Sequence, residues 1–282
     1  MSSAVETRLL TLRRALLAFR ETPGRRGRLV HLQDVDDLLV GGDMHGNLEN
    51  FRKLMQRAEL VRFPRRHLVL QEVVHGPFLY PGSGDKSHQL LDLICALKCQ
   101  YPRQVHFLVG NHELAQATGR KVLKNDADLN ELFLEGVRFA YGSRADDVYA
   151  LYLDVIATAP LALRTPGRVF VSHSLPSAGM LPDFNPAALE YEPTRPADLA
   201  AGGSVYSLVW GRDVREETVA GFLSKVDSDV LITGHIPCDA GFARPSPWHV
   251  IIDSQGSPAG YCLVPAARPI SPAELEGCIH LL

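Results

Sequence analysis

A regular alternation of short apolar runs and helix-like patterns constrains the fold of this chain more than any other feature. Apolar runs occupy residues 38–40, 68–74 and 105–109, and apolar residues at helical spacing occupy residues 48–58 and 90–97 between them. Strands that alternate with helices build a sheet with parallel strands and right-handed crossovers. The first half of the chain is therefore predicted to form an α/β unit.

The second half of the chain has a different pattern. Short β-like runs stand at residues 169–172, 230–233, 249–252 and 261–264, and long stretches with Pro and Gly, notably residues 175–204, separate them. A long loop inside a compact domain is usually functional or disordered. Because no internal repeat and no clear boundary is visible, one domain with a second sheet is the simplest interpretation.

An amphipathic helix is predicted at the start of the chain. It covers residues 4–20 and is ended by Pro23 and Gly24. We expect residues 1–27 to form an N-terminal helix and linker, and residues 28–282 to form the main domain. The helix is expected to pack on that domain, with a contact surface for a partner as the alternative.

The composition excludes several classes of protein. The 282 residues carry a formal net charge of -3, which gives no electrostatic reason for a nucleic-acid or acidic-membrane partner. No segment has the roughly 18 apolar residues of a membrane span. Arginines interrupt the first twenty residues, so they do not form a secretory signal, and an odd number of cysteines, five, opposes a disulfide framework. We expect a cytoplasmic protein without nucleic-acid or membrane partners.

Metal-competent side chains follow four of the expected strands. They are Asp43 and His45 after the first strand, Asn111, His112 and Glu113 after the third, His173 after residues 169–172, and His235 after residues 230–233. Ligands collect at the carboxyl ends of strands in open α/β sheets, and nearby glycines let the backbone approach an ion closely. The four strand ends are therefore expected to converge on one site.

Each motif taken alone also has a plain structural explanation. Asn111 could be the N-cap of a helix, and the residues around Asp43 could be a capped turn. His173 and His235 could each be a buried polar group with satisfied hydrogen bonds. The argument for a metal site rests on the four motifs occurring together and in order.

This ordered set resembles the calcineurin-like metallophosphoesterases and, within them, the serine/threonine phosphoprotein phosphatases. Residues 43–46 match the family's Asp-x-His-Gly and residues 110–113 match its Gly-Asn-His-Glu, while His173 and His235 take the places of the last two histidines. A Trp-containing segment, residues 208–213, also precedes the final His as in the phosphatases. The resemblance implies two mixed β-sheets packed as a sandwich with flanking helices, the αββα form of an α/β fold, over residues 28–282.

The family's Gly-Asp-x-x-Asp-Arg-Gly block is altered in this chain. Gln71 and Glu72 stand where Gly-Asp is expected, so Glu72 is the candidate for the carboxylate that bridges two metal ions. Glu and Asp ligate divalent ions alike, but the longer side chain shifts either the backbone or the ion.

The second half of the same block departs further. His75 and Gly76 stand where Asp-Arg is expected, and Asp85 and Lys86 are the candidates to replace that pair. The alternative is that Asp85 and Ser87 cap the following helix.

The resemblance also implies a ligand set and a reaction. The first metal site would have Asp43, His45 and Glu72, and the second Glu72, Asn111, His173 and His235. Mixed nitrogen and oxygen ligands favour two divalent ions, Mn²⁺ first and Fe or Zn²⁺ as alternatives. The reaction would be hydrolysis of a phosphate monoester by in-line attack of a metal-bound hydroxide.

The remaining roles follow from the same resemblance. His112 would be the general acid, with Asp85 or else Glu113 as its carboxylate partner. Lys86, Arg212 and Asn111 would hold the phosphate; for Arg212 the alternative is a surface ion pair with Asp213 or Glu216.

The resemblance leaves three functions open. Pro237 stands where many phosphodiesterase members have a second metal-binding His, which favours the serine/threonine phosphatase branch. The expected substrate is a phosphorylated protein or a small phosphoester. A dinucleotide-polyphosphate hydrolase and a non-catalytic scaffold are the alternatives.

Overall fold

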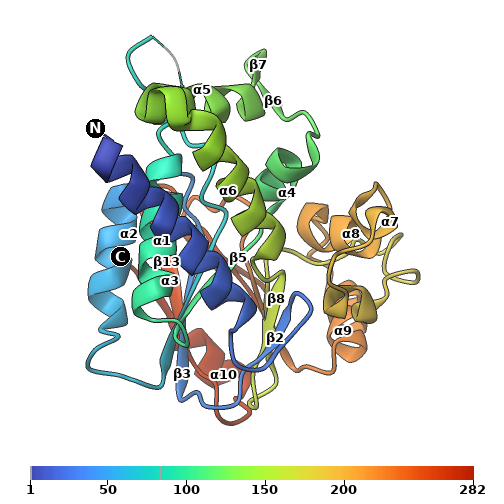
Figure 1. The fold of residues 1–282 in the computed structure, drawn as a ribbon. Helices are drawn as coiled ribbons and strands as arrows, with labels where there is room; N and C mark the ends of the chain where they lie inside the picture. Colours follow the sequence, from blue (N-terminus) through green and yellow to red (C-terminus); the bar gives the residue numbers. More distant parts are fainter. Residues whose placement is uncertain (1, 83) are drawn as a thin grey trace.

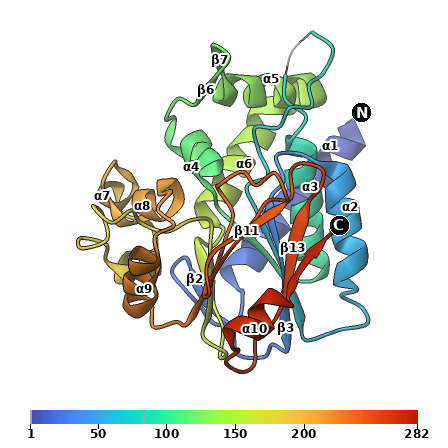
Figure 2. The same cartoon turned by 180° about the vertical axis from the view of Figure 1, so that it is seen from behind.

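Two mixed β-sheets lie at the centre of the molecule, and helices cover them from outside (Figures 1 and 2). The computed structural model describes residues 2–82 and 84–282, so residue 1 of the expected N-terminal segment and residue 83 lie outside this description. The expected α/β fold with two mixed sheets and flanking helices is confirmed.

The smaller of the two sheets contains the strands of the predicted β-α-β-α-β unit. Its order is β14-β13-β3-β4-β5. The strands are β3 (Asp37–Asp43), β4 (Arg66–Gln71), β5 (Val105–Leu108), β13 (Gly260–Pro265) and β14 (Ile279–Leu281). Strands β3, β4 and β5 are parallel, and helices α2 (Leu48–Ala58) and α3 (His88–Gln100) connect them.

The larger sheet has the order β1-β2-β8-β9-β10-β12-β11. The strands are β1 (Arg25–Arg26), β2 (Leu29–His31), β8 (Ala162–Arg164), β9 (Val169–Ser172), β10 (Val230–Thr233), β11 (Phe242–Ser246) and β12 (His249–Ile252). Strands β9, β10 and β12 are parallel, so their carboxyl ends lie at one edge of the sheet.

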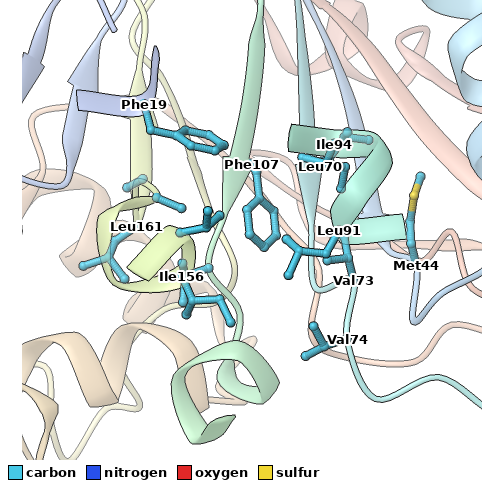
Figure 3. Close-up of a cluster of buried hydrophobic side chains, with 14 of the residues drawn as sticks. Phe19, Met44, Leu70, Val73, Val74, Leu91, Ile94, Phe107, Ile156 and Leu161 are labelled. Atoms are coloured by element: carbon cyan, nitrogen blue, oxygen red, sulfur yellow. The ribbon is translucent and has the colours of Figure 1, made fainter. Parts of the chain in front are cut away.

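The core between the sheets follows from strand alternation. In β3, Leu38 and Val40 belong to the buried cluster between the sheets, whereas Leu39 belongs to the cluster under the helices. Successive side chains of a strand point to opposite faces, so a strand buried on both faces reads as a continuous apolar run. Figure 3 shows the helix-side cluster, in which Phe107 and Leu70 lie among side chains from the helices.

The N-terminal helix contributes directly to this core. Helix α1 (Ser2–Arg20) contacts α3 and α6 (Ala145–Thr158), and Leu12, Ala15 and Phe19 are fully buried. Phe19 belongs to the helix-side cluster and lies near Phe107 in Figure 3. None of the helices in the described part of the chain is long and apolar enough to cross a membrane.

The remaining helices surround the sheets. They are α4 (Asn111–Thr118), α5 (Leu129–Tyr141), η1 (Gly142–Arg144), η2 (Pro186–Glu190), α7 (Pro196–Leu199), α8 (Ser204–Trp210), α9 (Glu216–Lys225) and α10 (Pro272–Glu276). A short hairpin, β6 (Leu123–Lys124) with β7 (Ala127–Asp128), precedes α5. The long stretch at residues 175–204 is built on η2 and α7, and α7 to α9 gather on one flank of the molecule (Figure 1).

Candidate metal centre

The carboxyl ends of β3, β4, β5, β9 and β10 meet at one place. Asp43 is the last residue of β3, Glu72 follows β4, and Asn111 begins α4 shortly after β5. His173 follows β9 directly, and His235 follows β10 by two residues. A cavity of about 260 Å³ opens at this edge, lined by residues that include Asp43, His45, Glu72, His75, Asn111, His112, Arg212 and His235.

One group of potential metal ligands consists of His45, Glu72 and His112. His45 Nε2 lies 3.3 Å from Glu72 Oε1, and His112 Nε2 lies 3.9 Å from the same oxygen. His45 Nδ1 lies 2.8 Å from the carbonyl oxygen of Val74, which can only accept, so Nδ1 carries the hydrogen. Without a cation, Nε2 of protonated His45 donates to Glu72 Oε1, whereas a neutral His45 would turn its lone pair towards this carboxylate. Two facing acceptors of this kind fit a cation between them.

A second group surrounds the other oxygen of Glu72. His173 Nε2 lies 3.1 Å from Glu72 Oε2, 3.0 Å from Asn111 Oδ1 and 3.1 Å from His235 Nδ1. Asp43 lies beside this group, with Oδ1 3.6 Å from His173 Nδ1. Glu72 is thus shared by both groups, and the donor atoms are the imidazole, carboxylate and amide types that suit Mn²⁺, Fe or Zn²⁺.

The backbone at the centre is held in an unusual conformation. His45, Glu72, His75 and His235 have φ values of 41°, 39°, 61° and 69°, all in the left-handed region. Residues with a side chain rarely adopt this conformation, and it persists where the surrounding structure enforces it, often at functional sites. Here it turns the chain sharply at three strand ends, which brings the side chains into the cavity.

Glycine is required where the backbone passes close to a carboxylate. A Cβ atom on Gly110 would lie 2.1 Å from Glu72 Oε2, and one on Gly234 would lie 2.3 Å from Asp43 Oδ1. Only glycine permits such close approach. Gly110 and Gly234 therefore leave room for the carboxylates of Glu72 and Asp43.

Burial and charge oppose each other in the centre. Burial raises the pKa of Asp43 to about 6, although neighbouring histidines lower it. For His45, burial lowers the pKa, but the hydrogen bond and charge of Glu72 outweigh burial and raise it to about 9. For Glu72, burial raises the pKa, but His173 and His45 hold it well below its usual value. The carboxylates thus depend on nearby positive charge, which divalent cations supply more strongly.

The comparison with protein families decides the assignment. The model of the calcineurin-like phosphoesterases matches residues 37–239, which include every strand end described above. The chain belongs to the calcineurin-like phosphoesterase family. The resemblance inferred from the strand-end motifs is thereby confirmed.

Individual relatives of this phosphoesterase are distant. A probable serine/threonine-protein phosphatase from Encephalitozoon cuniculi is 25% identical over a match of 232 residues, and this match covers 76% of this chain and 45% of that protein. The phosphoesterase therefore spans less than half the length of this curated relative.

Solved structures establish the same fold. A protein serine/threonine phosphatase from Saccharomyces cerevisiae has a TM-score of 0.68 and 15% identity, with 98% of this chain and 88% of the yeast chain covered. A cold-active protein-tyrosine phosphatase from a psychrophilic Shewanella species has a TM-score of 0.61 and 13% identity, with 90% and 82% covered.

Most of the predicted site residues of this phosphoesterase come together. They are Asp43, His45, Glu72, Asn111, His112, His173, Arg212 and His235. Arg212 Nε lies 3.1 Å from His235 Nε2 and so faces the cavity. The alternative ion pair of Arg212 with Asp213 does not form, because Asp213 pairs with Arg215.

The expected placement of Asp85 and Lys86 is corrected by their contacts. Asp85 accepts hydrogen bonds from the backbone and hydroxyl of Ser87 and from the backbone of Gly76, so it stabilises the turn before α3. Lys86 Nζ lies 5.2 Å from the centre of the Tyr80 ring. The residues that line the cavity do not include this pair.

Glu113, the other expected partner of His112, is also engaged elsewhere. Its carboxylate accepts from the backbone N–H groups of Val73, Val74 and Gly110 at 2.7, 3.0 and 3.0 Å. This carboxylate stabilises the backbone around the centre and has no part in the cavity lining.

Several residues around the cavity escaped the sequence analysis. His75 contacts His112, and the lining also includes Asp253, Gln255, Leu123 and Lys124. The position of His75 within the altered family block was the available signal for that residue. The hairpin residues had none, since their approach to the cavity depends on the path of the chain after α4.

Proposed function

We propose that this phosphoesterase holds two divalent metal ions and hydrolyses phosphate monoesters, as a protein phosphatase of the serine/threonine type. The observation that carries the proposal is the sharing of Glu72 by two groups of ligand atoms inside one cavity. The names of the Encephalitozoon and yeast relatives support the choice of substrate class.

The ligand assignment divides the cavity in two. Asp43, His45 and Glu72 would hold the first ion, and Glu72, Asn111, His173 and His235 would hold the second. Asp43, which lies beside the second group, thus takes the place of His112 as a ligand, and His112 stays available as a proton donor. Manganese fits this mixture of nitrogen and oxygen donors, and iron or zinc would also be accepted. When bound, the ions supply a water of lowered pKa and positive charge for the phosphoryl oxygens.

The side chains around the ligands have separate tasks. Arg212 offers a planar guanidinium at the cavity wall and would bind phosphoryl oxygens, together with the amide of Asn111. His112 Nε2 is turned into the cavity and would give a proton to the leaving oxygen. Asp85 and Lys86 have no part in this arrangement.

The rim suits a substituent larger than phosphate. Leu123 of the β6–β7 hairpin lines the cavity and is 67% exposed, and Lys124 lies beside it. They would give the alcohol side of the ester one apolar and one cationic neighbour, which fits a phosphorylated protein segment or a small phosphoester.

Hydrolysis of p-nitrophenyl phosphate under a Mn²⁺ titration tests the proposal. We expect metal-dependent turnover that is lost in Asp43→Asn and reduced in His112→Asn by a factor on the order of 10²–10⁴. Asp36→Asn, an exposed carboxylate on the same chain, is the matched control and should keep wild-type turnover. Wild-type protein that binds no Mn²⁺, Fe²⁺ or Zn²⁺ would instead indicate a scaffold.

A substrate panel separates the remaining alternatives. A phosphoserine peptide and a dinucleotide polyphosphate are compared by kcat/KM at saturating metal. A preference for the peptide supports the phosphatase, and a preference for the polyphosphate would replace it with the nucleotide hydrolase.

A further inference from the structure

His75 and Gln116 hold His112 in place through side-chain hydrogen bonds. His75 Nδ1 lies 2.9 Å from His112 Nδ1, and His75 Nε2 lies 2.7 Å from Gln116 Oε1. His112 and Gln116 are four residues apart on α4, so they lie on one face of that helix. His75, which comes from the loop after β4, therefore bridges two successive turns of α4.

The direction of each hydrogen bond follows from the far end of this network. Gln116 Nε2 lies 3.4 Å from the carbonyl oxygen of Asn130 and 2.7 Å from the hydroxyl of Tyr149. A carbonyl only accepts, so the amide nitrogen faces Asn130 and the amide oxygen faces His75. His75 Nε2 must then donate, and a neutral His75 accepts at Nδ1. In the hydrogen bond between the two rings, His112 Nδ1 therefore donates to His75 Nδ1. His112 Nε2 faces the cavity.

The network is built into the structure. His75 is 7% exposed and Gln116 is 4% exposed, and the His75 ring packs edge-on against Phe133 with their centroids 6.2 Å apart. The backbone of His75 has a φ of 61°, a conformation that costs free energy for a residue with a side chain. The orientation of the His75 ring is therefore set by buried contacts and not by contacts at the surface.

Among the described residues, no carboxylate takes the role of His75 as the hydrogen-bond partner of His112 Nδ1. Asp85 is engaged with the Ser87 hydroxyl and with two backbone N–H groups. Glu113 is engaged with three backbone N–H groups. The acceptor of the hydrogen bond from His112 Nδ1 is thus a side chain that carries no negative charge.

We propose that His75, with its tautomer set by Gln116, is the positioning residue of His112 and acts as a neutral acceptor where a carboxylate was expected. The inference rests on the proposed function, in which His112 protonates the leaving oxygen. Before that step, neutral His112 takes up a proton from water at Nε2. The ester P–O bond then breaks, water supplies the new P–O bond, and the alcohol leaves with this proton, which returns His112 to the Nδ1–H tautomer. His75 and Gln116 keep Nε2 directed at the leaving oxygen.

Nitrogen NMR of the histidine rings tests the network without metal or turnover. In chelator-treated full-length protein, we expect His75 as the Nε2–H tautomer and His112 as the Nδ1–H tautomer. Gln116→Leu removes the acceptor and should release His75 into a mixture of tautomers, whereas Gln116→Glu keeps an acceptor and should preserve the pattern. A wild-type His75 that carries its hydrogen on Nδ1 overturns the inference even if neither variant folds.

Leaving-group dependence tests the consequence for catalysis. An alkyl leaving group needs a proton more than p-nitrophenolate does, so Gln116→Leu should lose about tenfold more in kcat on a phosphoserine peptide than on p-nitrophenyl phosphate. Gln116→Glu should stay within about threefold of wild type on both, and bound metal should be unchanged in both variants. Equal losses on the two substrates would refute a positioning role.

The two tests also separate this inference from the proposed function. Wild-type protein with no turnover on either substrate overturns the phosphatase assignment. The tautomers of His75 and His112 still decide whether His75 positions His112.

Discussion

Strands β4 and β5 carry buried titratable side chains at both ends, but the two ends are built differently. At the carboxyl end, Glu72 and His112 face the cavity, and Glu72 has a left-handed backbone. At the amino end, His67 of β4 and His106 of β5 stack with 5.1 Å between ring centroids and share a 2.8 Å hydrogen bond. Neither of these two histidines has a left-handed backbone.

Lys98, near the amino-end histidines, has a full set of hydrogen-bond acceptors. Its buried ammonium donates to Thr22 Oγ1 at 2.9 Å and to the carbonyl oxygens of Pro102 and Val105 at 2.6 and 3.0 Å. Three acceptors match the three hydrogens of a lysine. At the carboxyl end, by contrast, His45 Nε2 lies 3.3 Å from Glu72 Oε1, and these two atoms would become ligands of a cation placed between them. Burial of titratable groups therefore does not identify a functional site, whereas converging acceptors on a strained backbone do.

The largest expected effect contrasts Glu72 with His106. Glu72→Gln should lower turnover at least about 100-fold and reduce bound metal, because the shared carboxylate is lost from both ligand groups. The isosteric side chain keeps the packing, but His45 and His173 lose the negative charge beside them, so the free energy of unfolding of the metal-free protein should also fall, by about 1–3 kcal/mol. Enzyme assays, metal analysis and urea unfolding measure the three quantities.

His106→Leu should lower stability without lowering turnover. It leaves His67 Nδ1 without its partner, so the free energy of unfolding should fall by about 1–3 kcal/mol, while turnover at saturating metal stays within about twofold of wild type. A large loss of turnover in His106→Leu would break the distinction between the two ends.

The next largest effect is the pH dependence of the unfolding free energy that Lys98 causes. Burial lowers the pKa of Lys98 to about 7, so between pH 7 and the ordinary lysine value the unfolded chain binds more protons than the folded protein. Stability due to this residue therefore rises with pH across that window. Relative to Lys98→Met, the wild type should gain about 2 kcal/mol in unfolding free energy between pH 7 and pH 9.

The matched control for this pH series is Lys53→Met, which removes an exposed lysine from α2. Its stability difference from wild type should be nearly constant over the same range. A flat difference for Lys98→Met as well would mean that the ammonium is better solvated than its surroundings indicate.

The difference between local sequence patterns and long-range contacts explains which features could be predicted from the sequence. Strands β9, β10 and β12 have the predicted bounds, because four-residue apolar runs between turn residues suffice to define them. The ligand motifs could likewise be predicted, because each lies at or just after the end of a strand. The predicted strand at residues 68–74 ends early, at Gln71, because Glu72 turns the chain with a φ of 39°.

Other features depend on contacts that no local pattern encodes. The partner of His112 comes from 37 residues earlier in the chain, and its place is set by the pairing of β4 with β5, in which Gln71 lies opposite Leu108. Asp85 was proposed as the replacement for the family's Asp, but its carboxylate accepts hydrogen bonds from Ser87 and Gly76. Side-chain partners of this kind follow from strand register, which a single sequence does not reveal.

The smallest expected effect lies at the cavity wall. Arg212→Lys keeps the positive charge but loses the planar fork and the 3.1 Å contact with His235, so KM for a phosphoester should rise about three- to tenfold with a smaller change in kcat. Arg215→Lys is the matched control, because Arg215 is exposed and pairs with Asp213. If both variants raised KM equally, general charge attraction would explain substrate binding. An increase confined to Arg212→Lys would show that the carboxyl end of the strands recognises phosphate by geometry as well as by charge.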